Sequence, residues 1–166
     1  MDNYNKLRFL ENHDQPRIAS FIRRESDLVN YTAMLYFLKG TTLIYAGQEF
    51  ENDHLPSLFE KEPIDRASGR DLSALMRRMY DLKRTALDAQ DDFLARADDE
   101  HAIAVLERVG NSVRKVGVFS LRSECAAVEV PVPDGDYVNL IDGSTVSVKN
   151  HKFFCAGRPI FFTLPA

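Results

Sequence analysis

An amide, an imidazole and a carboxylate stand side by side in this chain of 166 residues, as Asn12, His13 and Asp14. They follow the short apolar run Leu7–Leu10, whose composition is typical of a buried strand. Pro16 has no backbone N–H and cannot extend that strand as part of a ladder. Three side chains that can donate, accept and carry charge at the end of a strand predict a binding or catalytic site.

A helix and a second strand follow this turn. Ser26 is a residue type that caps helices and Gly40 is one that ends them, and apolar residues recur between them at positions 28, 31, 35 and 38. The run Thr41–Ala46 is apolar and β-branched and lies between two glycines, which predicts a buried strand. The predicted order is therefore strand, helix, strand.

A long polar segment separates these elements from the clearest helix. Residues 47–70 contain Pro56 and Pro63 and predict a surface loop with one helical turn at most. Residues 71–88 then place their apolar side chains on a single helical face. The acidic segment 88–100 breaks that pattern, and we expect a solvated domain boundary there.

From His101 onward the hydrophobic period changes to about two, which is typical of strands. Asp142-Gly143 is the sharpest hairpin signal among the turns that separate the runs. We therefore expect an α/β segment over residues 1–92 and an all-β antiparallel sheet or sandwich over residues 93–166. The six predicted strands are 102–109, 113–121, 126–132, 136–141, 144–149 and 159–164.

Charge and hydropathy exclude two classes of partner. The net charge of −4 and the isoelectric point near 5.6 would repel a phosphate backbone, so we expect no nucleic acid partner. No apolar run approaches the roughly 20 residues that span a bilayer, so we expect no membrane partner.

The spacing of cysteines and histidines predicts no metal and no cofactor. Neither cysteine belongs to a CxxC or Cys/His pattern, and His54, His101 and His151 lack the spacing of metal ligands. We expect Cys125 and Cys155 to be two buried thiols, while a disulfide between neighbouring strands stays open as the alternative.

Three stretches of the chain resemble one family. The block Phe9–Arg17, with the sequence FLENHDQPR, resembles the F-x-x-N-H-D motif that ends the seventh barrel strand in the α-amylase family of glycoside hydrolases. Lys39–Glu49 resembles the eighth-strand segment with its G-Q-E ending, and Leu58–Asp65 resembles the loop that follows it. An isolated Asn-His-Asp is more typical of a simple turn with a capping Asp, but three linked matches favour the family.

The resemblance implies the last two βα units of a TIM-type barrel, followed by the family's C-terminal β-domain, and an α-glucan or α-glucoside as substrate. It implies that Asp14 holds hydroxyls of the sugar beside the scissile bond and stabilises the transition state. His13 would donate a hydrogen bond to the same sugar, Asn12 would support the turn, and Arg17 would bind near the rim of the site. Gln48 and Glu49 are expected to be structural.

Retaining glycoside hydrolysis also needs a nucleophile and a general acid, about 5 Å apart. We find no G-x-R-x-D block in the chain, and two βα units are too few to close a barrel. We therefore expect a hydrolase or glucanotransferase fragment that is inactive alone. The alternative is a non-catalytic carbohydrate-binding or protein-interaction module derived from the family.

An incomplete barrel predicts exposed sheet edges and apolar surface over the βα segment. We expect that surface to drive self-association into a homo-oligomer, or else to pack onto the β-domain.

Overall fold

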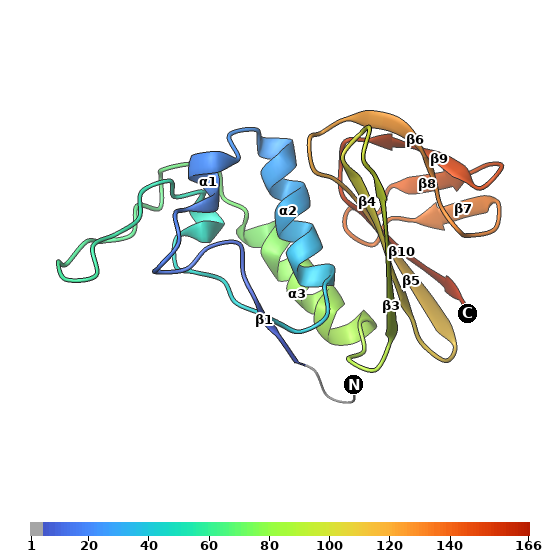
Figure 1. Cartoon of the computed structure of the whole chain (residues 1–166), viewed down its shortest axis with the longest axis horizontal. Helices are drawn as coiled ribbons and strands as arrows, with labels where there is room; N and C mark the ends of the chain where they lie inside the picture. The colour runs from blue at the N-terminus through green and yellow to red at the C-terminus, as the bar shows by residue number, and fades with distance from the viewer. Residues whose placement is uncertain (1–4) are drawn as a thin grey trace.

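The computed structural model describes residues 5–166, and its first part is a small parallel βα arrangement (Figure 1). Strands β1 (Leu7–Arg8) and β2 (Thr41–Thr42) pair in parallel. Helices α1 (Ile18–Phe21) and α2 (Glu25–Phe37) lie between them along the chain. The predicted order of strand, helix and strand is thus confirmed, with the short helix α1 as an addition.

Both strands are shorter than the apolar runs that predicted them. Among the described residues β1 and β2 have only each other as ladder partners. The two segments separate after the hydrogen bond from Leu43 N to the carbonyl of Arg8. A strand is defined by its ladder, so composition alone gave bounds that were too long.

The predicted helices are both present and pack against each other (Figure 1). Helix α3 (Ser73–Ala86) buries Met76, Met79 and Leu82, which lie on its predicted apolar face. Helix α2 begins one residue before Ser26, whose side chain makes no capping bond there. The segment between η1 (Gln48–Phe50), a single 3₁₀ turn, and α3 forms the long loop that projects from the molecule in Figure 1.

Eight strands follow α3, two more than predicted. They form a four-stranded antiparallel sheet in the order β10-β5-β4-β3 and two antiparallel pairs, β6-β9 and β7-β8. The turn at Asp142-Gly143 joins the pair β7-β8, as predicted. The strands are β3 (Asp92–Asp98), β4 (Ile103–Val109), β5 (Val113–Ser120), β6 (Cys125–Glu129), β7 (Gly135–Val138), β8 (Thr145–Val148), β9 (Lys152–Ala156) and β10 (Ile160–Pro165).

The expectation of a solvated linker over residues 88–100 is wrong for most of that segment. Its second half is strand β3, which occupies an edge of the four-stranded sheet and pairs with β4 from Asp92 to Asp98. Most β3 side chains are exposed, and charged side chains on an edge strand are the usual protection against unwanted pairing. The polar side chains of this segment therefore belong to an edge strand and not to a linker.

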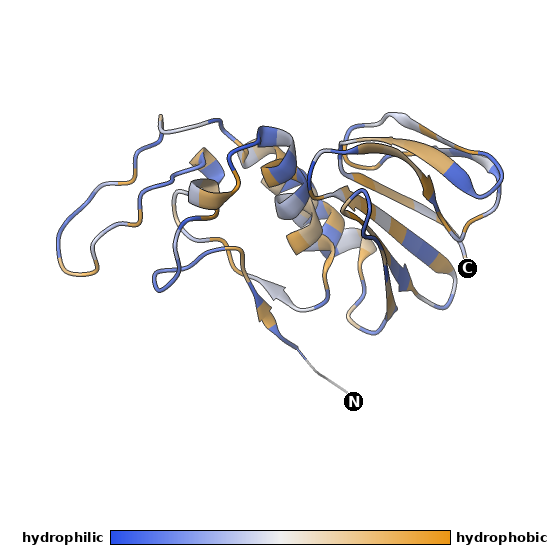
Figure 2. Ribbon diagram, turned by 45° about the horizontal axis from the view of Figure 1, so that its top comes forward, coloured by the Kyte–Doolittle hydropathy of each residue, from blue (hydrophilic) through white to orange (hydrophobic). Residues whose placement is uncertain are grey.

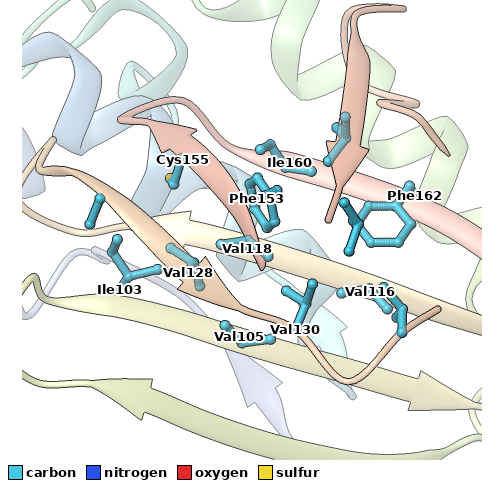
Figure 3. Close-up of a cluster of buried hydrophobic side chains, with 14 residues drawn as sticks. Ile103, Val105, Val116, Val118, Val128, Val130, Phe153, Cys155, Ile160 and Phe162 are labelled. Atoms are coloured by element: carbon cyan, nitrogen blue, oxygen red, sulfur yellow. The ribbon is translucent and has the colours of Figure 1, made fainter. Parts of the chain in front are cut away.

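The four-stranded sheet is covered on both faces. One face packs against β6, β8 and β9, and Figure 3 shows Val116 and Val118 of β5 among the side chains of this cluster, together with Phe153 of β9. The other face packs against the helices, where the Phe37 ring of α2 lies 5.7 Å from that of Phe119 and 5.2 Å from that of Phe161. The βα segment therefore packs onto the β-domain through its helices.

Apolar side chains are exposed at several places on the βα segment, including the predicted strand β1. Leu7 of β1 is 52% exposed and Phe59 in the long loop is 93% exposed. Figure 2 shows these hydrophobic stretches along β1 and at the tip of the projecting loop. None of the helices within residues 5–166 is both long and apolar enough to span a bilayer.

Candidate active site

The Asn12–Asp14 turn follows β1 after the intervening residues 9–11. The Asn12 side-chain oxygen accepts a hydrogen bond of 2.9 Å from the backbone N–H of Asp14, and the Asn12 carbonyl accepts one of 3.3 Å from Gln15. A side-chain oxygen that bonds the backbone two residues on makes an Asx turn. Asn12 thus holds the turn in shape, which fixes the direction of the two side chains that follow.

His13 and Asp14 point into solvent from this turn. Their side chains are 59% and 65% exposed, and His13 Nε2 lies 3.3 Å from Asp14 Oδ2. An exposed carboxylate beside an imidazole offers acceptors and a donor on one small surface. That combination suits a ligand with several hydroxyl groups.

A buried ion pair lies next to the turn. Arg17 Nη1 lies 2.6 Å from Glu11 Oε1, and both side chains are fully buried. The second carboxylate oxygen of Glu11 accepts a hydrogen bond of 2.7 Å from the Ile18 N–H at the start of α1. Burial raises the pKa of Glu11, while the hydrogen bond from Arg17 opposes that rise.

Arg17 is buried beside the turn, and its guanidinium forms hydrogen bonds within the protein. Its Nε donates to the His54 carbonyl at 3.1 Å and its Nη2 to the Ala46 carbonyl at 2.9 Å. Its guanidinium lies 4.4 Å from the centre of the Tyr45 ring. The three groups surround the guanidinium and exclude water, so Arg17 ties the Asn12–Asp14 turn to the segment that follows β2.

Glu11 is the residue of this arrangement that the sequence did not single out. The one available signal was an acidic residue six positions before Arg17, beside an apolar run. Opposite charges at that spacing are common on surfaces, and nothing in the local pattern marks these two as buried.

Gly47 allows the segment after β2 to approach Arg17. Its φ is +93°, and a Cβ added there would lie 3.2 Å from Arg17 Nη2 and 3.1 Å from Asn52 Cγ. Its N–H donates to Glu49 at 2.9 Å, and the buried Gln48 accepts from the Tyr45 N–H at 3.4 Å. Gln48 and Glu49 bond backbone groups, as expected for structural residues.

The base of the long loop is fixed next to this segment. The buried Asn52 donates to the Asp65 carbonyl at 2.6 Å and to Ser68 Oγ at 2.7 Å, which brings the two ends of the loop together. Farther out, His54 Nε2 lies 2.9 Å from Glu62 Oε2. Because the His54 carbonyl also binds Arg17, the loop and the Asn12–Asp14 turn share one anchor.

The described residues hold no group of three His, Cys, Asp or Glu side chains that could bind a metal ion. Both cysteines are free thiols in the structure, Cys155 buried and Cys125 exposed. The expectation of two buried thiols is therefore correct for Cys155 and wrong for Cys125.

The chain matches two family models. The model of the alpha amylase catalytic domain matches residues 1–102, and that of the bacterial alpha amylase C-terminal domain matches residues 95–162. A search of curated proteins gives no match.

Solved structures resemble the chain over nearly its full length. An α-amylase from Lactobacillus plantarum is 28% identical with a TM-score of 0.88, over 98% of this chain and 38% of its own. A maltogenic α-amylase from Thermotoga neapolitana is 22% identical with a TM-score of 0.81, over 100% and 42%. An α-amylase from Geobacillus thermoleovorans, solved with acarbose, is 15% identical with a TM-score of 0.77, over 96% and 38%.

This chain spans about two fifths of the length of the first two of these structures. Its fold is that of a TIM-barrel segment followed by an all-β C-terminal domain, as the resemblance implied. Since the catalytic-domain model covers more than half of the sequence, the chain belongs to the α-amylase family of glycoside hydrolases.

Proposed function

We propose that this chain is the C-terminal part of a hydrolase or glucanotransferase that acts on α-glucosidic bonds of oligo- or polysaccharides. In this proposal residues 1–92 are the last two βα units of the barrel and residues 93–166 are the β-domain. The solved relative from Geobacillus thermoleovorans was captured with acarbose, which supports an α-glucan or α-glucoside as the substrate class.

The Asn12–Asp14 turn carries the proposal. Asp14 accepts hydrogen bonds from hydroxyls of the sugar at the scissile bond, and His13 donates to the same sugar. Both side chains are exposed after a barrel strand, and residues at the carboxyl ends of barrel strands are where TIM-barrel enzymes place their chemistry. Hydrogen bonds of this kind strengthen as the sugar distorts toward the oxocarbenium-like transition state and supply several kcal/mol.

Arg17 has a positioning role in this proposal and does not bind the sugar. Its guanidinium is bonded to Glu11 and to the backbone on the far side of the turn, so its donors are committed to the protein. It holds the turn that presents His13 and Asp14.

The nucleophile and the general acid come from outside these 166 residues, because the chain contains no G-x-R-x-D block. Asp14 stabilises the transition state and breaks no bond itself. We therefore expect the chain alone to hydrolyse neither maltose, starch nor an activated α-glucoside. Turnover by the purified chain that disappears in Asp14→Ala would overturn this expectation.

The role of Asp14 is tested in an enzyme that joins these residues to the nucleophile and the acid. Asp14→Asn should lower kcat on starch by about a thousand-fold, because the lost hydrogen bonds strengthen in the transition state. Asp99→Asn is the matched control, since Asp99 is an exposed carboxylate in the turn between β3 and β4. Equal activity of the two variants would remove Asp14 from the catalytic machinery.

A further inference from the structure

A groove opens between β8 and β9. Figure 1 shows these two strands in the layer of the β-domain that lies away from the helices. The two strands are joined at one end by backbone hydrogen bonds of 2.8 and 3.0 Å between Lys149 and Lys152. Beyond that point β8 pairs with β7 and β9 pairs with β6, and no ladder joins β8 to β9 in the described part of the chain. The strands therefore diverge, and the buried side chains of Val146, Phe153 and Ile160 form the floor of the gap.

An aromatic ring stands in the wall of this groove. Phe154 is 67% exposed, whereas its neighbours Phe153 and Cys155 are buried in the core. Strand alternation turns the Phe154 side chain outward. Across the groove the exposed Thr145 and Ser147 of β8 line the opposite wall.

The mouth of the groove is polar and carries one charge of each sign, Arg158 and Asp142. Arg158 is exposed and forms no ion pair within residues 5–166. Asp142 uses its Oδ1 to accept bonds of 2.9 and 2.6 Å from the N–H and hydroxyl of Ser144. The Arg158 guanidinium and the second carboxylate oxygen of Asp142 are therefore available for hydrogen bonds to a ligand.

The same two residues also line a second hollow. That hollow lies between the start of α2, with Glu25 and Ser26, and the segment Gly157–Pro159. Since Asp142 and Arg158 belong to both linings, the two hollows are neighbours on the surface, and we call them together the depression.

We infer that this depression is a second α-glucan binding site, separate from the Asn12–Asp14 turn. An exposed aromatic face packs against the C–H face of a sugar ring, and a carboxylate, a guanidinium and hydroxyls bind sugar hydroxyls. One charge of each sign in the lining favours a neutral ligand over an anionic one. Two neighbouring hollows favour several linked sugars over one. The identity of the sugar rests on the proposed function.

The inference is tested by electrophoresis of the 166-residue chain through native gels that contain soluble starch. The wild-type chain should be retarded, and Phe154→Ala and Arg158→Ala should each reduce the retardation at least five-fold. Tyr80→Ala is the matched control because Tyr80 is 56% exposed on α3, outside both hollows, and it should migrate like wild type. Thermal melts of all variants show whether the fold is intact.

Asp14→Ala separates this site from the proposed active site. If the depression binds glucan, this variant should be retarded like the wild-type chain. Retardation that is lost in Asp14→Ala and kept in Phe154→Ala would overturn the inference while supporting the proposed function. A wild-type chain that is not retarded would also overturn it, whereas the assay of Asp14→Asn in the larger enzyme would stand independently.

Discussion

Lys115 Nζ lies 2.8 and 2.9 Å from the two carboxylate oxygens of Asp91, and both side chains are buried. Lys115 belongs to β5, and Asp91 lies between α3 and β3. The backbone carbonyl of Asp91 also accepts a bond of 2.7 Å from Lys39, just after α2. The pair therefore joins the sheet to the end of the helical layer.

Asp91→Ala should destabilise the chain by about 3–5 kcal/mol, because it leaves the Lys115 ammonium buried without its counterion. Urea unfolding followed by circular dichroism measures the change. Asp92→Ala is the control, since Asp92 is the neighbouring carboxylate and is exposed. That variant should stay within about 0.5 kcal/mol of wild type. Equal losses in the two variants would show that burial of the pair does not matter.

Gly47→Ala should destabilise the chain by more than Gly143→Ala. Both glycines have positive φ, +93° and +79°, so both substitutions carry the backbone cost of about 1–2 kcal/mol. Only at Gly47 would the new methyl group also press on Arg17 and Asn52, whereas nothing lies within 4 Å of it at Gly143. The difference between the two melting temperatures measures that contact. Equal melting temperatures would mean that the loop moves aside without cost.

One thiol per chain should react quickly with a thiol reagent under native conditions. Cys125 is exposed, and burial raises the pKa of Cys155, which keeps its thiol protonated and unreactive. In the β6-β9 pair Cys125 lies opposite Ala156 and Ala126 lies opposite Cys155, so the two thiols occupy opposite faces of the pair. A native disulfide is thereby excluded. Cys125→Ser should abolish the fast reaction, and a second fast thiol in that variant would contradict the structure.

The elements predicted correctly are those whose side-chain pattern records burial on one side. In α3, Met76, Met79 and Leu82 repeat at helical spacing because one face packs on α2 and the sheet. β3 was missed because its side chains are mostly exposed, which leaves no alternation between apolar and polar residues.

Long-range pairing was the other limit on prediction. Asp91 seemed to be part of a solvated acidic run, yet it is buried because Lys115, 24 residues away, is placed beside it by the sheet. Arg17 is buried because the chain after β2 folds over it. In both cases the burial of a charge depends on a partner brought in by tertiary structure, which local sequence does not record.

The contribution of Glu11 to the stability of the chain should fall as pH rises past the ordinary range of a glutamate. Burial raises the pKa of Glu11 in the folded chain above its unfolded value of 4.5. The folded state therefore binds more protons than the unfolded state between the two pKa values. The resulting stabilisation is fully present below pH 4.5 and is lost as pH rises through the folded pKa.

Glu11→Gln removes the titrating group, and because the amide oxygen can accept from only one of Arg17 and Ile18, the test compares pH slopes and not absolute stabilities. The free energy of unfolding, measured in urea from pH 4 to pH 7, should decrease more with pH in wild type than in Glu11→Gln. Glu62→Gln serves as the opposite control, since the hydrogen bond with His54 lowers the pKa of that exposed carboxylate. A wild-type curve parallel to that of Glu11→Gln would show that the Glu11 carboxyl has the same proton affinity in the folded and unfolded chains.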